Sequence, residues 1–344
     1  MKRLPAICWC VFCLAICGAA GAGSADPNLK RFESTQVQMG VPFKLLLYAP
    51  DEAAAKGAFA AAFARVADLD RRLSDYDPGS ELSRLSRSAP MAQGVAVSEP
   101  LWYVLERSQD LAERTHGAFD VTVGPYVRLW RRARRTGEMP SEARMAEARA
   151  AVGYQHLKLD AADHTAQLLR PNMRLDLGGI AMGYAVDEVL KLLRSRGIDR
   201  VLVDASGDIG VGNPPPGKTG WTVGIMPLSA EGSPTRYISL ANAAVTTTGD
   251  VFQHVDIGGK RYSHIVDPHT GLGLTNRLGV AIIAPTCITA DGLYTAVAVL
   301  GSQAGLELIE NTPGAAAFIV RPSDGEPEIL QSRRFEAFVV PAPN

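Results

Sequence analysis

One segment decides the fold of this chain, and it is Arg174-Leu175-Asp176-Leu177-Gly178-Gly179-Ile180-Ala181-Met182-Gly183-Tyr184-Ala185. It predicts a strand that ends at Asp176, then two glycines, then a helix with its C-terminal cap at Gly197. The free backbone amides of such a helix start allow a phosphate to approach closely. Glycines that only permit tight strand–helix packing explain the same pattern, and the dinucleotide fingerprint G-x-G-x-x-G is absent.

The segments on both sides of this run mix strand and helix patterns. Apolar residues predict strands near residues 41–48, 157–169, 200–204, 221–225 and 237–240, and helices near 51–73, 100–115 and 141–151. The regular strand–helix alternation of a doubly wound parallel sheet is missing. The sequence therefore predicts the α+β class. Without an internal repeat or a long linker, we expect a single compact domain over residues 34–340.

The charge of the chain is nearly balanced, with a formal value of −1 at pH 7. Such a balance offers no field that would attract a polyanion, so nucleic acid is not an expected partner. The arginines are nevertheless uneven, because Arg131, Arg132, Arg134 and Arg135 form a short basic segment ahead of the helix predicted at 141–151. We expect this basic segment to be exposed.

The N-terminus indicates export. Lys2 and Arg3 precede an apolar run over 4–20, and small residues follow up to position 25, so residues 1–25 have the pattern of a secretory signal peptide. The apolar run falls short of the ~20 residues of a spanning helix. Cys17 follows a sequence that resembles a lipoprotein cleavage site. A periplasmic location is therefore expected, and soluble release and a lipid anchor both stay open.

The cysteines exclude two kinds of stabilising or reactive centre in the mature chain. All of them except Cys287 lie in the predicted signal peptide. A single remaining cysteine can form neither an internal disulfide nor a thiolate metal cluster. A metal site in this chain is therefore expected to use oxygen or nitrogen ligands.

Asp291 and Thr295 are the first candidates for such a site. They are four residues apart, so on a helix they share one face. A carboxylate and a hydroxyl are hard oxygen ligands that suit Mg²⁺ or Ca²⁺. The alternative is that Asp291 caps the N-terminus of a helix and Thr295 fills space beside the core.

His264 is a candidate for proton transfer, because it lies between a strand-like run and the turn predicted at Asp267, Pro268 and Gly271. An imidazole can accept a proton near neutral pH. A structural histidine in a satisfied environment is the alternative.

Together these three motifs, in this order, resemble the ApbE family of FAD:protein FMN transferases, and the resemblance extends from about residue 38 to residue 338. Further matching stretches are Gln38-Met39-Gly40, Leu73-Ser74-Asp75-Tyr76, Gly117-Ala118-Phe119-Asp120, Asp204-Ala205-Ser206-Gly207-Asp208 and Thr248-Gly249-Asp250. The resemblance implies a mixed α/β roll. It also implies a Mg²⁺-dependent enzyme that cuts FAD, releases AMP and attaches FMN to a threonine hydroxyl of an acceptor, a membrane-associated redox protein.

The resemblance also implies roles for individual residues. His264 would deprotonate the acceptor hydroxyl, and the carbonyl oxygen of Gly179 with the side chains of Asp291 and Thr295 would hold Mg²⁺. The residues implied to contact FAD are Met39, Tyr76, Ala118, Phe119, Asp120, Asp176, Met182 and Ile265. Met182 departs from the family, which usually has Lys or another polar residue there.

Two other functions compete with protein flavinylation. If water replaces the acceptor hydroxyl, the same site is an FAD pyrophosphatase that releases FMN and AMP. A periplasmic flavin-binding protein would need neither the pair Asp291 and Thr295 nor His264, so the presence of all three favours catalysis.

Overall fold

The structure is a computed structural model that describes residues 28–225, 234, 236–249, 254–323 and 326–342. The predicted signal peptide and Asp250 lie outside the described residues. Among the helices that are described, none combines the length and the apolar character needed to cross a bilayer.

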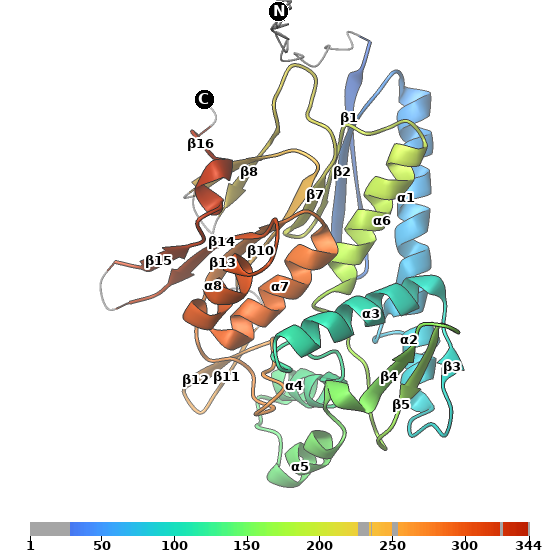
Figure 1. Ribbon diagram of the computed structural model, residues 1–344, viewed down its shortest axis with the longest axis vertical. Coiled ribbons are helices and arrows are strands. Elements are labelled where there is room, and N and C mark those ends of the chain that lie inside the picture. Colours follow the sequence, from blue (N-terminus) through green and yellow to red (C-terminus); the bar gives the residue numbers. More distant parts are fainter. Residues whose placement is uncertain (1–27, 226–233, 235, 250–253, 324–325, 343–344) are drawn as a thin grey trace, which may run out of the picture.

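The centre of the molecule is an eight-stranded antiparallel sheet with the order β1-β2-β6-β7-β10-β13-β14-β15 (Figure 1). Its strands are β1 (Lys30–Gln38), β2 (Val41–Ala49), β6 (Val201–Ala205), β7 (Asp208–Val211), β10 (Ala243–Gly249), β13 (Gly279–Ala284), β14 (Ala316–Arg321) and β15 (Glu328–Gln331). Antiparallel pairing throughout explains why the sequence lacks regular strand–helix alternation.

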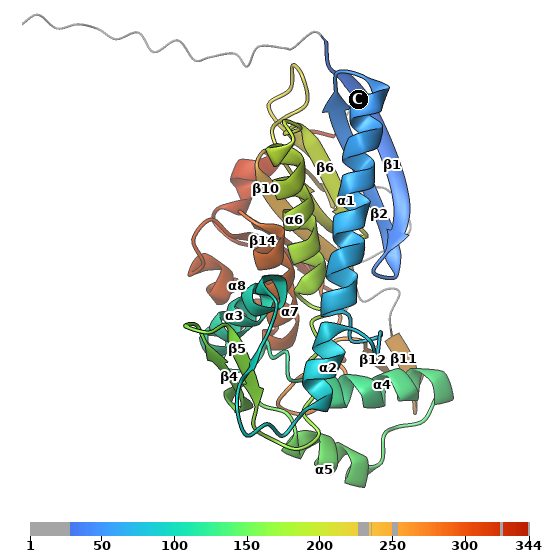
Figure 2. The same ribbon diagram turned by 90° about the vertical axis from the view of Figure 1, so that its right-hand side faces the viewer.

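Helices cover one face of this sheet and a small sheet covers the other. The helices are α1 (Glu52–Leu73), α6 (Ala181–Ser195), α7 (Cys287–Leu300) and α8 (Ser302–Glu310), with α1 and α6 side by side in both views (Figures 1 and 2). The small sheet is β8 (Trp221–Ile225), β9 (Arg236–Leu240) and β16 (Val339–Val340), which follows the 3₁₀ turn η2 (Phe335–Phe338). β13 shows the division, because Ile282 packs on the helices and Ile283 on the small sheet.

The remaining elements gather at one end of the sheet, at the bottom of Figure 1. The helices there are α2 (Glu81–Arg87), α3 (Glu99–Arg114), α4 (Gly124–Thr136) and α5 (Glu142–Ala150), with the 3₁₀ turn η1 (Tyr154–His156). The strands are β3 (Val95–Ala96), β4 (Leu157–Asp160) and β5 (Thr165–Leu168) in one sheet, and β11 (His254–Ile257) with β12 (Lys260–Ser263) as a hairpin. The predicted α+β class is confirmed. The strand predicted to end at Asp176 is wrong, because this segment forms only an isolated β-bridge between Arg174 and Val123.

The basic segment is helical, and the prediction that it is exposed holds for Arg132 and Arg135 but not for Arg131 and Arg134. The arginines belong to the C-terminal half of α4, whose buried residues include Tyr126, Trp130 and Ala133. These residues recur at helical spacing, and Trp130 donates a hydrogen bond of 2.7 Å to the carbonyl oxygen of Gly271. The many charges conceal this apolar face in the sequence, and Arg131 is only partly exposed.

Two contacts fix α6 against α7. The carboxylate of Asp187 on α6 accepts hydrogen bonds from the backbone amides of Cys287 (2.8 Å) and Ile288 (2.9 Å), the first residues of α7. These amides have no partner within their own helix, so Asp187 caps α7 from outside. Gly183 lies so close to the Cys287 carbonyl that a Cβ atom at this position would clash with it. The close approach therefore requires glycine.

We predict opposite effects of one substitution at two helical glycines. Gly183→Ala should lower the free energy of unfolding by about 1–3 kcal/mol, because the new methyl group pushes α6 away from α7. Gly57→Ala on α1 is the matched control, since no atom lies within 4 Å of the added Cβ. It should raise the stability by up to about 1 kcal/mol through helix propensity. Urea unfolding measures both, and equal effects would contradict the packing described here.

Candidate active site

A cavity of about 720 Å³ opens where the β1–β2 turn, the start of α6, the middle of α7 and the loop after β12 meet. It brings together the predicted catalytic, FAD-binding and metal-binding residues. These residues are Met39, Tyr76, Ala118, Phe119, Asp120, Asp176, Gly179, Met182, His264, Ile265, Asp291 and Thr295. Segments separated by more than half the chain thus form one site, and the roles of its residues stay predictions.

The three predicted metal ligands lie at the junction of α6 and α7. A Cβ atom on Gly179 would lie 2.5 Å from the hydroxyl oxygen of Thr295, so the glycine backbone packs directly on that side chain. Asp291 is 5% exposed and accepts a hydrogen bond of 3.1 Å from the amide of Gly183. The alternative in which Asp291 caps its own helix is wrong, because α7 begins after Thr286.

A second carboxylate adds to the negative charge near Asp291. Asp208, at the start of β7, is buried, lines the cavity and accepts a hydrogen bond of 2.7 Å from the Thr246 hydroxyl. Burial and the charge of Asp204 raise the pKa of Asp208 to about 7, against the effect of the Thr246 bond. Burial, and then the charge of Asp208, raise the pKa of Asp291 well above its usual range. The sequence assigns no role to Asp208, although the stretch from Asp204 to Asp208 is part of the resemblance to the family.

These groups fit a hard divalent cation. Burial disfavours the ionised form of both carboxylates, so a positive ion would stabilise both, and the surrounding oxygens are hard ligands. Across the described residues there is no group of three or more His, Cys, Asp or Glu side chains that could hold a metal. Backbone and hydroxyl oxygens, and phosphate oxygens of a substrate, would therefore have to complete the coordination, as is usual for Mg²⁺.

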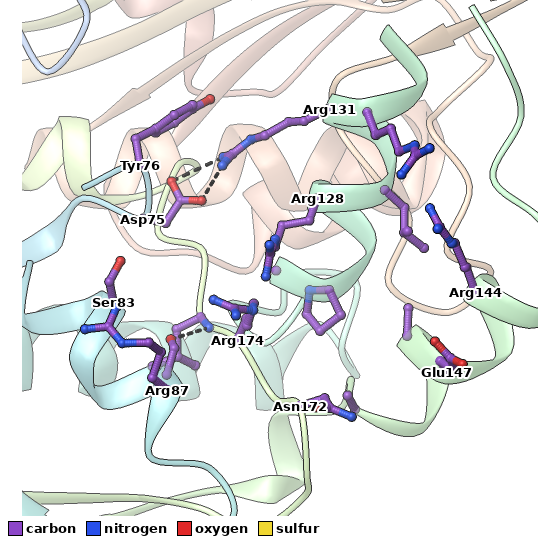
Figure 3. A pocket seen from close by; sticks show the side chains of 18 of the residues that line it. Asp75, Tyr76, Ser83, Arg87, Arg128, Arg131, Arg144, Glu147, Asn172 and Arg174 are labelled. Carbon is purple, nitrogen blue, oxygen red and sulfur yellow. Dashed lines mark hydrogen bonds and ion pairs between the residues drawn. The ribbon is translucent and has the colours of Figure 1, made fainter. Parts of the chain in front are cut away.

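Arg131 is the second functional candidate that sequence reasoning missed. Its guanidinium donates a hydrogen bond of 2.9 Å to the carboxylate of Asp176. It also forms a two-pronged ion pair with Asp75 and lies 3.9 Å from the ring centre of Tyr76 (Figure 3). Burial and the charge of Asp75 raise the pKa of Asp176 to about 6, while Arg131 favours its ionised form. The arginine thus joins α4 to the loops on which two predicted FAD contacts lie. Only the folded structure reveals this role.

The Ala118–Asp120 loop is held by the chain itself. The amide of Phe119 donates to the Thr115 hydroxyl at 3.1 Å. Asp120 accepts hydrogen bonds from the amides of Thr122 (2.7 Å) and Tyr154 (2.8 Å), so both carboxylate oxygens already have partners. This loop is therefore a fixed wall of the cavity.

His264 and Ile265 follow β12 and precede the predicted turn, which the structure contains. The amide of Gly271 donates to the carbonyl oxygen of Asp267 at 2.8 Å, and the Asp267 side chain accepts from the amide of His269 and the hydroxyl of Thr270. Asp267 therefore serves the turn, whereas His264 lines the cavity. The imidazole is partly buried, a suitable setting for proton transfer to a bound substrate.

Comparisons with known proteins show the family of this chain. The ApbE family model matches residues 39–319. Two curated proteins named FAD:protein FMN transferase are similar: that of Klebsiella pneumoniae is 31% identical over 88% of this chain and 87% of its own length, and that of Haemophilus influenzae is 33% identical over 75% and 77%.

Solved structures agree as well. The flavin transferase ApbE from Vibrio cholerae superposes with a TM-score of 0.81 and 28% identity, over 90% of this chain and 99% of that one. The ApbE protein from Thermotoga maritima gives a TM-score of 0.78, also at 28% identity and over 90% and 99% of the two chains. The family model covers most of the chain and the relatives match most of its length, so this chain belongs to the ApbE family.

Proposed function

We propose that this protein is an FAD:protein FMN transferase that uses Mg²⁺, attaches FMN to a threonine hydroxyl of an acceptor protein and releases AMP. The observation that carries the proposal is the cavity itself. It combines a volume suited to a large ligand, a set of oxygen ligands at Gly179, Asp291 and Thr295, and a histidine on the facing loop. The two relatives that bear the name of this activity are 31% and 33% identical and match 88% and 75% of this chain.

The chemistry of the proposed reaction is a displacement at phosphorus. The acceptor hydroxyl oxygen attacks the flavin-side phosphorus of FAD, the bond from that phosphorus to the AMP oxygen breaks, and AMP leaves. His264 takes the hydroxyl proton. A bound Mg²⁺ would supply charge neutralisation on the diphosphate.

The remaining residues of the cavity bind and orient. Asp291 and Thr295 lie one helical turn apart and would hold the metal with the Gly179 carbonyl oxygen. Tyr76 offers an aromatic surface that Arg131 supports from one side, and we assign it to contact with a planar ring of FAD. Asp120 and Asp176 form part of the wall of the cavity.

The proposal extends to compartment and partner. The pattern of residues 1–25 supports an exported, periplasmic enzyme that is either released or anchored by a lipid at Cys17. We propose a membrane-associated redox subunit as the acceptor.

The test of the proposed function uses a cell-envelope extract from a strain that lacks this gene. Incubation of the extract with the purified protein, FAD and Mg²⁺ should produce a protein band that fluoresces under ultraviolet light. Mass spectrometry of that band should find FMN on a threonine. Release of free FMN and AMP without a labelled protein would instead establish a pyrophosphatase.

A matched pair of threonines on α7 tests the metal ligands. Thr295→Val should raise the Mg²⁺ concentration for half-maximal FAD cleavage by about tenfold or more, because the metal loses an oxygen ligand. Thr289→Val is the control, since that hydroxyl contacts Thr286 rather than the cavity. Asp291→Asn should abolish cleavage at millimolar Mg²⁺ while the protein stays folded by circular dichroism. Mg²⁺ titrations of Thr295→Val and Asp291→Asn that match the wild type would refute the assignment of these residues as metal ligands.

A substitution at His264 separates catalysis from binding. His264→Ala should leave the dissociation constant for FAD within a few-fold, since a base acts on the proton in transfer rather than on the bound ground state. Acceptor labelling should slow by ~10²–10⁴-fold. Quenching of FAD fluorescence reports binding and gel fluorescence reports labelling. Labelling at the normal rate would make His264 structural, and loss of FAD binding would make it a residue that holds the substrate.

A further inference from the structure

A second cavity, of about 930 Å³, lies beside the first, and Asp75, Tyr76 and Arg131 line both. Its other walls are rich in arginine. Beyond the shared Arg131, the arginines that line it are Arg87, Arg128, Arg132, Arg135, Arg144 and Arg174 (Figure 3). We call this cavity the arginine cleft. The only acidic residues among those that line it are Asp75 and Glu147.

Three helices and one extended segment bring these charges together. Arg128, Arg132 and Arg135 recur at three- and four-residue spacing on one face of α4. Arg87 ends α2, and Arg144 lies on α5. Different parts of the chain thus contribute to one concave surface.

The backbone of Arg174 is fixed against α4 by a close contact. Val123 and Arg174 form a β-bridge, and a Cβ atom on Gly124 would lie 2.6 Å from the Arg174 carbonyl oxygen. This contact sets the Arg174 side chain beside Arg128, as Figure 3 shows. The arrangement is therefore built by the fold rather than by flexible side chains alone.

The positive charge of the arginine cleft is not balanced within the described chain. Asp75 is engaged by Arg131. Within the described ranges, no carboxylate oxygen lies within 4.0 Å of the guanidinium of Arg87, Arg128 or Arg174. Burial, and then the charges of Arg128 and Arg87, lower the pKa of Arg174. An anionic partner would relieve this repulsion.

We propose that the arginine cleft docks an acidic segment of the acceptor protein and so presents the acceptor's threonine hydroxyl to the first cavity, which we call the flavin cavity. The identity of this partner rests on the proposed function. The negative charge of the partner is inferred from the arginine cleft, because guanidinium groups on several walls suit carboxylates. Arg87, Arg128 and Arg144 are exposed, which fits a protein segment better than an enclosed small ligand.

The position of the arginine cleft supports the same partner. The arginine cleft directly adjoins the cavity that the acceptor hydroxyl would enter, and the Arg131–Asp75 pair forms the shared wall. The formal charge of the whole chain is −1, so long-range attraction of an acidic protein has to come from a local patch. Charges placed this way increase the association rate and fix the orientation of a partner.

Direct binding tests the cleft without requiring transferase activity. The probe is a fluorescein-labelled peptide of alternating Glu and Ser, with binding followed by fluorescence anisotropy at low and at physiological salt. The wild-type protein should bind it in a salt-dependent manner. The triple variant Arg87→Ala, Arg128→Ala, Arg144→Ala should bind at least about tenfold more weakly.

The control removes the same amount of charge elsewhere. Arg71→Ala, Arg107→Ala, Arg196→Ala changes three exposed arginines that do not line either cavity, and it should bind the peptide as the wild type does. Equal weakening in both triple variants, or no peptide binding by the wild type, would overturn the proposal. So would stronger competition by inorganic pyrophosphate or by phosphatidylglycerol vesicles than by unlabelled peptide, because these would indicate a small-anion or membrane site.

Activity then separates this proposal from the proposed function. With the envelope protein that the wild type labels, supplied in its unlabelled form as the acceptor, the cleft variant should show a raised KM for the acceptor and an unchanged KM for FAD. If the wild type labels no protein yet binds the peptide through the cleft, the transferase assignment fails while the acidic docking surface stands. If labelling is normal in the cleft variant, the docking proposal fails and the transferase assignment stands.

Discussion

The close contact between α6 and α7 is the constraint on which the site depends. Gly183 allows the two helices to approach, Asp187 caps α7 from α6, and the Gly183 amide binds the Asp291 carboxylate. The same approach sets Gly179 against Thr295. One packing arrangement thus stabilises the core and brings the Asp291 carboxylate, the Thr295 hydroxyl and the Gly179 backbone to the lining of one cavity.

The rest of the cavity is assembled around this junction by long-range contacts. Arg131 links α4 to Asp75 and Asp176, and its guanidinium supports Tyr76. The large sheet holds Asp208 near Asp291. The lining of the cavity therefore has two kinds of surface: oxygen atoms and negative charge at Asp208 and Asp291, and an aromatic ring beside a cation at Tyr76 and Arg131. A dinucleotide substrate with a diphosphate and planar rings has the matching chemistry.

The sequence predicted the features that local patterns encode. The helix at 51–73, the helix after Gly178 and Gly179, and the strand at 41–48 are all present, because each has a clear apolar period and a recognisable start or end. The sequence did not predict helix α4, because its arginines outnumber the apolar residues that recur at helical spacing. The sequence also did not predict the roles of Arg131 and Asp208, since each depends on partners that only the tertiary structure brings near.

The most direct test is a crystal of the protein grown with FAD and Mn²⁺, which replaces Mg²⁺ and gives an anomalous signal. The account predicts an anomalous peak about 2.2 Å from the Gly179 carbonyl oxygen and from side-chain oxygens of Asp291 and Thr295, in contact with the diphosphate of FAD. A peak held by other residues, or FAD bound outside the cavity with no peak at the α6–α7 junction, would contradict it.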